Sequence, residues 1–138
     1  MGSGLALQIR RNYPDITKGY TTACNRLSFE YIKKKGIVYF YKISDRKYIA
    51  SIFGQEDYGR DSSRVYTDYE SLLNGLKTVK NKALRDGLSI AIPYKIGCGL
   101  GNGNWKFVEK EIETCFSDSP ELIVKIYKYT EKEKIKVW

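Results

Sequence analysis

The segment 90–105 constrains the fold of this chain more than any other part of its sequence. A mainly apolar run at 88–92 predicts a buried strand, and Asn104 opens a helical pattern. Between them lie four glycines at alternating positions: Gly97, Gly99, Gly101 and Gly103. Glycine lets the backbone approach a ligand closely, and N–H groups at a helix N-terminus face an anion. This order predicts a phosphate-binding loop, and a plain tight connection between strand and helix is the alternative.

The chain begins with a second glycine-rich entry into a helix. Its first six residues are Met1, Gly2, Ser3, Gly4, Leu5 and Ala6. Leu5 and Ile9 would share one face at helical spacing, which predicts a short helix over 5–12. A remnant of an expression vector is the other interpretation of Met1–Gly4.

Composition and charge narrow the functional classes. The length of 138 residues suits one domain over 1–138, with a charged tail at 130–138. No apolar stretch reaches the roughly 20 residues of a membrane span, and no secretory start is present. We therefore expect a cytoplasmic protein without a membrane partner. The net charge of +8 favours an anionic partner such as a nucleotide, an acidic protein surface or nucleic acid.

The absence of histidine excludes several kinds of site. A Ser-His-Asp triad and a Cys-His dyad need that residue, and the three widely spaced cysteines make no zinc motif. We expect no metal and no cofactor, and reduced thiols at Cys24, Cys98 and Cys115. The basic residues are dispersed and no aromatic–basic RNA motif occurs, so nucleic acid is not the expected partner.

Periodicity predicts alternating helices and strands. A second helix is expected over 14–35, and a hairpin over 37–53. Thr67 and Glu70 predict a capping box for a helix over 68–86, which Gly87 would close. A helix at 104–117 separates the strand at 88–92 from a last strand at 121–127. These two strands should be parallel, in a three-layer α/β/α sandwich with a mixed sheet, and a ligand should lie beyond their carboxyl ends.

The polar segment 54–66 is the other candidate for function, because long loops in small domains often carry it. Asp57 or Asp61 could activate water, and Arg60 or Arg64 could hold a phosphate. A solvated, charge-balanced loop is the alternative. Tyr58 and Trp105 could stack on a ribose or base, although Trp105 could equally pack beneath the glycine loop. Cys98 is expected to be a small packed residue rather than a nucleophile.

These segments together resemble the macrodomain family. The likeness rests on residues 1–8, 47–55 and 96–105, covers roughly residues 1–128, and is strongest to its phage and bacterial branch. That branch lies near the ADP-ribose-1″-phosphate phosphatases and the ADP-ribosyl hydrolases of the DarG type. The resemblance implies that ADP-ribose binds along the sheet crest. The residues that would hold the ligand are Gly2, Ser3, Gly4, Leu5 and Ala6 on one side, and Gly97, Cys98, Gly99, Leu100, Gly101 and Asn102 on the other.

The chain departs from the family pattern at its start. Family members carry about 20–30 residues before the first glycine motif, including a central strand, so an N-terminally truncated macrodomain is expected. The tail at 132–138 could add an edge strand in its place. Exchange of a strand with a second copy is the other hypothesis, and it implies a homo-oligomer.

A second departure concerns catalysis. Gln55 stands near the lysine position of the hydrolases, and Gly101 stands at their acidic position. A lysine-based covalent mechanism is therefore not expected. The resemblance leaves two hypotheses: hydrolysis of a 1″-phosphate or an ADP-ribosyl ester, with Gln55, Asp57 and Asp61 as catalytic candidates, or binding of a nucleotide signal without catalysis. A basic domain that binds nucleic acid is a third hypothesis, supported by charge alone.

Overall fold

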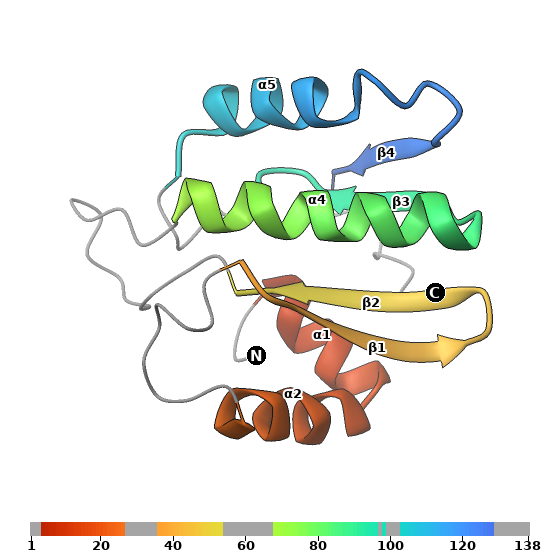
Figure 1. Ribbon diagram of the computed structural model, residues 1–138. Coiled ribbons are helices and arrows are strands. Elements are labelled where there is room, and N and C mark those ends of the chain that lie inside the picture. Colours follow the sequence, from red (N-terminus) through yellow and green to blue (C-terminus); the bar gives the residue numbers. More distant parts are fainter. Residues whose placement is uncertain (1–3, 27–35, 54–67, 97, 99–102, 129–138) are drawn as a thin grey trace. The chain divides into compact units, whose positions relative to one another are not determined.

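The computed structural model describes residues 4–26, 36–53, 68–96, 98 and 103–128 (Figure 1). The chain divides into two compact units, Met1–Lys34 with Tyr129–Trp138, and Lys35–Lys128. The expectation of a single domain over 1–138 stays a prediction.

The first unit contains the two expected N-terminal helices, α1 (Gly4–Asn12) and α2 (Asp15–Arg26). The Tyr13 N–H donates to the Ile9 carbonyl at 2.8 Å, so a last turn of helix precedes Pro14. Proline suits the entry of the next helix because its ring presets φ and it lacks an N–H to satisfy. The expected extension of the second helix to residue 35 and the tail at 130–138 lie outside the described residues.

The second unit opens with the expected hairpin of β1 (Val38–Ser44) and β2 (Lys47–Ile52). The two strands pair antiparallel, from Val38 opposite Ile52 to Ser44 opposite Lys47. The Phe53 N–H donates to the Ile37 carbonyl at 2.9 Å and extends the ladder by one residue. The hairpin prediction is confirmed.

The helix α4 (Tyr69–Asp86) has a different N-cap from the one expected. Asp68, not Thr67, is the cap, because its carboxylate accepts from the Ser71 N–H at 3.1 Å. The capping box of Thr67 and Glu70 is therefore wrong by one residue. The other end is as predicted: Gly87 adopts φ 64°, a left-handed conformation that glycine takes without a steric penalty, and α4 ends there.

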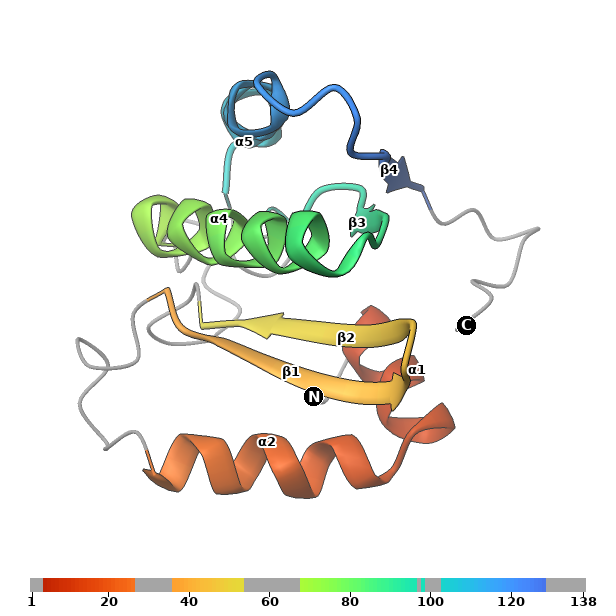
Figure 2. The ribbon, with the colours of Figure 1, turned by 45° about the vertical axis from the view of Figure 1, so that its right-hand side comes forward.

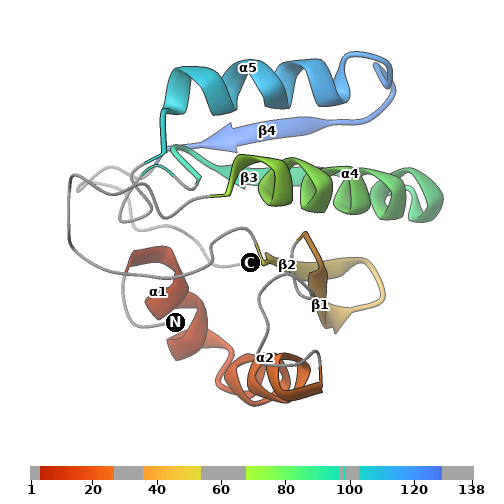
Figure 3. The same ribbon diagram turned by 60° about the vertical axis from the view of Figure 1, so that its left-hand side comes forward.

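In the chain, β3 (Ile90–Pro93) precedes α5 (Trp105–Phe116) and β4 (Val124–Tyr127) follows it. Figure 3 shows both strands on the same side of α5. They pair in parallel from Ile90 opposite Val124 to Pro93 opposite Tyr127. The predicted βαβ unit is confirmed, although β3 begins two residues later than expected. Among the described residues, the hairpin and this parallel pair form two separate two-stranded sheets rather than one hydrogen-bonded mixed sheet.

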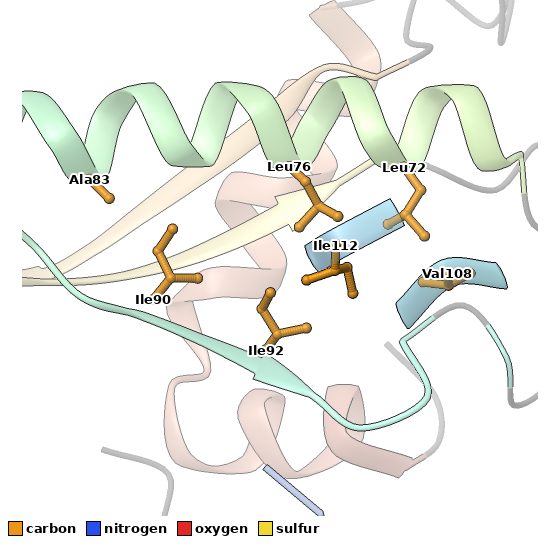
Figure 4. Packing of buried hydrophobic residues seen from close by; sticks show 7 residues of the cluster. All are labelled: Leu72, Leu76, Ala83, Ile90, Ile92, Val108 and Ile112. Atoms are coloured by element: carbon orange, nitrogen blue, oxygen red, sulfur yellow. The ribbon is translucent and has the colours of Figure 1, made fainter. Parts of the chain in front are cut away.

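The core of the second unit is built around α4. Leu72 and Leu76 of α4 meet Ile92 of β3, and Val108 and Ile112 of α5 close the cluster (Figure 4). These five side chains are at most 4% exposed, and the burial of their apolar surface stabilises this unit.

The hairpin also packs on α4, which Figures 1 and 2 show passing alongside it. Gly75 lies against Ile52 so closely that a Cβ atom on it would overlap the Ile52 Cγ2 methyl group. The absent side chain therefore lets β2 approach the helix backbone. At the other end of β2, Arg46 donates to the Gly87 carbonyl at 2.9 Å.

Lys80 connects α4 to the end of α5. Its Nζ donates to the Cys115 carbonyl at 2.8 Å and also bonds the Asp118 carboxylate. A cation near the last carbonyls of a helix is favourable, because those oxygens lack partners within the helix. The Lys80 hydrogen bond lowers the pKa of Asp118 below its ordinary value.

None of the helices in the described ranges is both long and apolar enough to cross a membrane.

The contact between Gly75 and Ile52 predicts an unusual effect of alanine. In an exposed helix position, Gly→Ala stabilises by about 1 kcal/mol. At Gly75 the added methyl group displaces β2, and overpacking costs about 1–3 kcal/mol. Gly75→Ala should thus lower the free energy of unfolding in urea, whereas the exposed control Asn81→Ala should leave it equal or higher. Stabilisation by Gly75→Ala would contradict this packing.

The Lys80 bridge predicts a pH-dependent stability. Lys80→Met should lower the melting temperature at pH 7, whereas Lys77→Met on the exposed surface of α4 should not. Because the pKa of Asp118 is lowered in the folded state, the ion pair stabilises above the ordinary carboxyl pKa of about 3.9. That contribution is lost as the pH falls through the lowered pKa. The difference in melting temperature between wild type and Lys80→Met should therefore narrow below about pH 4. A difference that does not change with pH would refute the link between stability and the protonation of Asp118.

Candidate functional site

The chain turns sharply where β3 ends. The Tyr94 N–H still donates to the Tyr127 carbonyl at 2.8 Å, but Ile96 then bonds back to Pro93 and Cys98 bonds back to Lys95. Lys95 has φ 60°, a left-handed conformation that is uncommon for a residue with a side chain. The chain thus leaves the carboxyl end of the sheet through a tight turn into the glycine segment.

The glycine segment ends at the N-terminus of α5, as predicted. Asn104 is the N-cap: its side chain accepts from the Phe107 N–H at 3.4 Å, and its carbonyl accepts from the Val108 N–H at 3.0 Å. The observed order of strand, segment 97–103 and helix N-terminus is the arrangement that suits an anion. Of that segment, the structure describes Cys98 and Gly103.

The N-terminus of α4 lies beside that of α5. The Tyr69 hydroxyl accepts a hydrogen bond from the Asn104 N–H at 2.9 Å, and the Tyr69 ring meets the Phe107 ring edge to face at 4.9 Å. Both helices run back along the strands, so their N-termini reach the carboxyl end of the parallel pair. Tyr69, the first residue of α4, and Asn104, the N-cap of α5, therefore lie side by side.

The two helix ends differ in charge. The start of α4 carries the carboxylates of Asp68 and Glu70, which offset its partial positive charge. The first turn of α5 has no acidic residue and contains Lys106. An anion at this edge would thus be favoured at α5 rather than at α4.

Trp105 lies at this edge together with Tyr94, Lys95 and Lys128, three residues that the sequence analysis did not single out. Trp105 is half-buried and packs against Tyr94 at 5.1 Å, which favours the packing interpretation of Trp105 over ligand stacking. The amino groups of Lys95 and Lys128 lie 5.6 and 5.1 Å from the Tyr94 ring. The signal for Tyr94 and Lys95 was their position directly after a predicted strand. Nothing local indicated Lys128, which follows β4.

Cys98 behaves as the packed residue that was expected. Its side chain is half-buried against the core cluster, and its thiol donates to the Ile96 carbonyl at 3.4 Å. Burial raises the pKa of Cys98, although nearby Lys95 acts in the opposite direction. A raised pKa leaves less thiolate near neutral pH, which disfavours a role as nucleophile.

Several predicted site residues lie outside the part of the chain that the structure describes: Gly2, Ser3, Gln55, Asp57, Tyr58, Arg60, Asp61, Gly97, Gly99, Leu100, Gly101 and Asn102. Gly4, Leu5 and Ala6 lie in the first turn of α1. They belong to the first unit and Cys98 belongs to the second. The convergence of the two glycine segments on one ligand therefore stays a prediction.

A hollow of about 380 Å³ lies elsewhere, near the amino ends of β3 and β4. Arg46, Gly87, Ser89 and Glu121 contribute to its lining, and no predicted site residue does. It is at the opposite end of these strands from Pro93 and Asn104. In the described ranges, no group of three or more Cys, Asp or Glu residues is placed to hold a metal ion.

No model of a known protein family matches the sequence. Individual proteins do match. A DNA ADP-ribosyl glycohydrolase of Mycobacterium tuberculosis is 28% identical over 127 residues, which are 92% of this chain and 34% of that protein. The Thermus aquaticus protein of the same name is 28% identical over 97% of this chain and 36% of its own length. The chain thus spans about a third of the length of these relatives.

Solved structures match the chain more fully. A protein of unknown function from Bacteroides thetaiotaomicron has a TM-score of 0.80 at 23% identity, over 92% of this chain and 78% of that one. The macrodomain of Thermus aquaticus DarG has a TM-score of 0.69 at 26% identity, over 94% of this chain and 82% of its own. The chain has a macrodomain fold. Both the α/β class and the resemblance to the macrodomain family are confirmed.

A third solved structure of similar fold is a complex with ADP-ribose. Thermosipho africanus DarTG in complex with ADP-ribose has a TM-score of 0.63 at 22% identity, over 96% of this chain and 35% of that chain. At this identity the likeness concerns the fold.

Proposed function

We propose that this macrodomain binds ADP-ribose, or an ADP-ribosyl group on a larger molecule, at the carboxyl end of its parallel strands. The observation that carries the proposal is the N-terminus of α5, which follows β3 through the glycine segment and is capped by Asn104. Backbone N–H groups of such a segment can bond a diphosphate without any charged side chain.

The charges at this edge support a diphosphate ligand. Lys95, Lys106 and Lys128 lie at or near the ends of β3, β4 and the start of α5, and the first turn of α5 contains no carboxylate. In this proposal the second glycine segment, with Asn102, holds the diphosphate, and the residues around Gly2 hold it from the other side. Arg60 and Tyr58 would contact the distal part of the ligand.

The relatives support the same ligand class. Two of them are named DNA ADP-ribosyl glycohydrolases, and a structure with this fold holds ADP-ribose. Their names also support a second candidate function, removal of an ADP-ribosyl group from DNA. The net charge of +8 fits a DNA-linked substrate.

The candidate activity requires a group that activates water. Asp57 and Asp61 are the side chains we propose for this role, with Gln55 orienting the water or substrate. The sequence offers no lysine at Gln55 and no acid at Gly101, and these two differences favour binding without turnover as the primary function.

Titration calorimetry with ADP-ribose tests the binding proposal. We expect heat with ADP-ribose and a weaker response with ribose 5-phosphate, which lacks the diphosphate. Gly99→Glu should abolish binding by placing a carboxylate in the anion site. Asn81→Glu makes the same charge change on an exposed part of α4, about 18 Å along the helix from its start, and should bind normally. If no heat is observed at about 1 mM ligand, the binding free energy is weaker than about −4 kcal/mol, and the proposal is rejected.

A turnover assay separates the two candidate functions. The macrodomain would be incubated with an ADP-ribosylated oligonucleotide and, separately, with ADP-ribose-1″-phosphate, and the products resolved by chromatography. If the primary function is binding without turnover, both substrates should remain unchanged and no product should form. Product from either substrate that disappears in Asp57→Asn or Asp61→Asn would instead establish hydrolysis and identify the residue that activates water.

A further inference from the structure

A single hydrogen bond joins the starts of α4 and α5, which are 35 residues apart in the sequence. The Asn104 N–H donates to the Tyr69 hydroxyl at 2.9 Å. Asp68 and Tyr69 follow segment 54–67, which contains candidate functional residues. Gly103 is the last residue of the glycine segment 97–103, and Asn104 follows it. Figure 1 shows that both helices begin at the same side of the second unit.

The Asn104 N–H needs a partner outside its own helix. The first N–H groups of an α-helix have no acceptor in the preceding turn, because no turn precedes them. The Asn104 side chain is already occupied by the Phe107 N–H, and its carbonyl by the Val108 N–H. The Tyr69 hydroxyl supplies the missing acceptor from the neighbouring helix.

The position of that hydroxyl is determined by packing. The Tyr69 ring meets Phe107 edge to face, at 4.9 Å between centroids and 72° between planes, a favourable geometry for aromatic pairs. Tyr69 is half-buried and also packs against the core cluster. The ring therefore has little freedom, and the hydroxyl holds Asn104 at a set distance from α4.

We infer that Tyr69 is a positioning residue for the ligand site: it sets the spacing between the base of segment 54–67 and the end of the glycine segment. This inference rests on the proposed binding of ADP-ribose. Binding is stronger when the donors are already in place, because less conformational freedom is lost on association. Tyr69 acts through Asn104 and does not itself need to touch the ligand.

If Tyr69 served stability alone, loss of its hydroxyl would lower the melting temperature. The positioning role predicts otherwise. Asn104 is exposed, so water can replace the Tyr69 hydroxyl as acceptor, and the folded state loses little stability. Water does not maintain the spacing between the helices. Loss of the hydroxyl should hence weaken ligand binding while leaving the melting temperature nearly unchanged.

Tyr69→Phe is the direct test, since it removes the hydroxyl and keeps the ring against Phe107. We expect its affinity for ADP-ribose, measured by calorimetry, to fall about threefold to tenfold, the equivalent of one ordinary hydrogen bond. The matched control is Tyr48→Phe on β2, where the ring lies 4.3 Å from the Lys82 amino group. Its affinity and melting temperature should equal those of wild type.

Amide hydrogen exchange provides a readout that does not depend on the ligand. The Asn104 N–H should exchange slowly in wild type and in Tyr48→Phe, and faster in Tyr69→Phe. Unchanged affinity in Tyr69→Phe would overturn the positioning role, and so would a loss of affinity matched by a lower melting temperature. If wild type binds no ADP-ribose, the proposed function fails and this role fails with it, while the exchange data still report whether the bond exists.

Discussion

The contact of α4 with both strand pairs is the constraint on which the larger unit depends. One side of this helix places Leu72 and Leu76 on the parallel pair, and Gly75 lets Ile52 of the hairpin reach the helix backbone. The described parts of the two sheets are not hydrogen-bonded to each other, so a shared helix joins them instead. Large side chains are needed on the side of α4 that faces the parallel pair, and glycine is needed on the side that faces the hairpin. These two requirements determine how α4 is rotated about its axis and how closely it approaches the hairpin.

The location of the candidate site follows from the direction of the helices. In a βαβ unit the helix returns antiparallel to its strands, so its N-terminus comes back to their carboxyl ends. α4 and α5 both do so, and Tyr69 meets Asn104 there. The carboxylates at the start of α4 and their absence from the first turn of α5 then make the two ends unequal for an anion. The direction of the helices thus determines at which end of the strands the candidate site lies. The charges of the first side chains determine that an anion is favoured at α5 rather than at α4.

The elements that sequence reasoning predicted well are those decided by neighbours along the chain. The hairpin turn, the left-handed Gly87 and the start of a helix at Asn104 all depend on residues within four positions. Thr67 was wrong because its spacing to Glu70 was followed, whereas Asp68 is the stronger N-cap residue and stands one position closer to the helix. The left-handed Lys95 was missed for a different reason: the bonds of the turn between Pro93 and Cys98 hold it there against its own preference.

The sequence by itself determined the α/β class, the parallel βαβ unit and the glycine segment between a strand and a helix. These features follow from hydrophobic periodicity and helix capping, which depend on residues close together in the chain. The tertiary structure alone decided that Trp105 packs against Tyr94, that Lys80 binds the Cys115 carbonyl, and that Tyr69 accepts from Asn104. Such partners lie 11 to 35 residues apart and meet only once a core has formed. Their geometry depends on how helices pack on strands, and no spacing within the sequence encodes it.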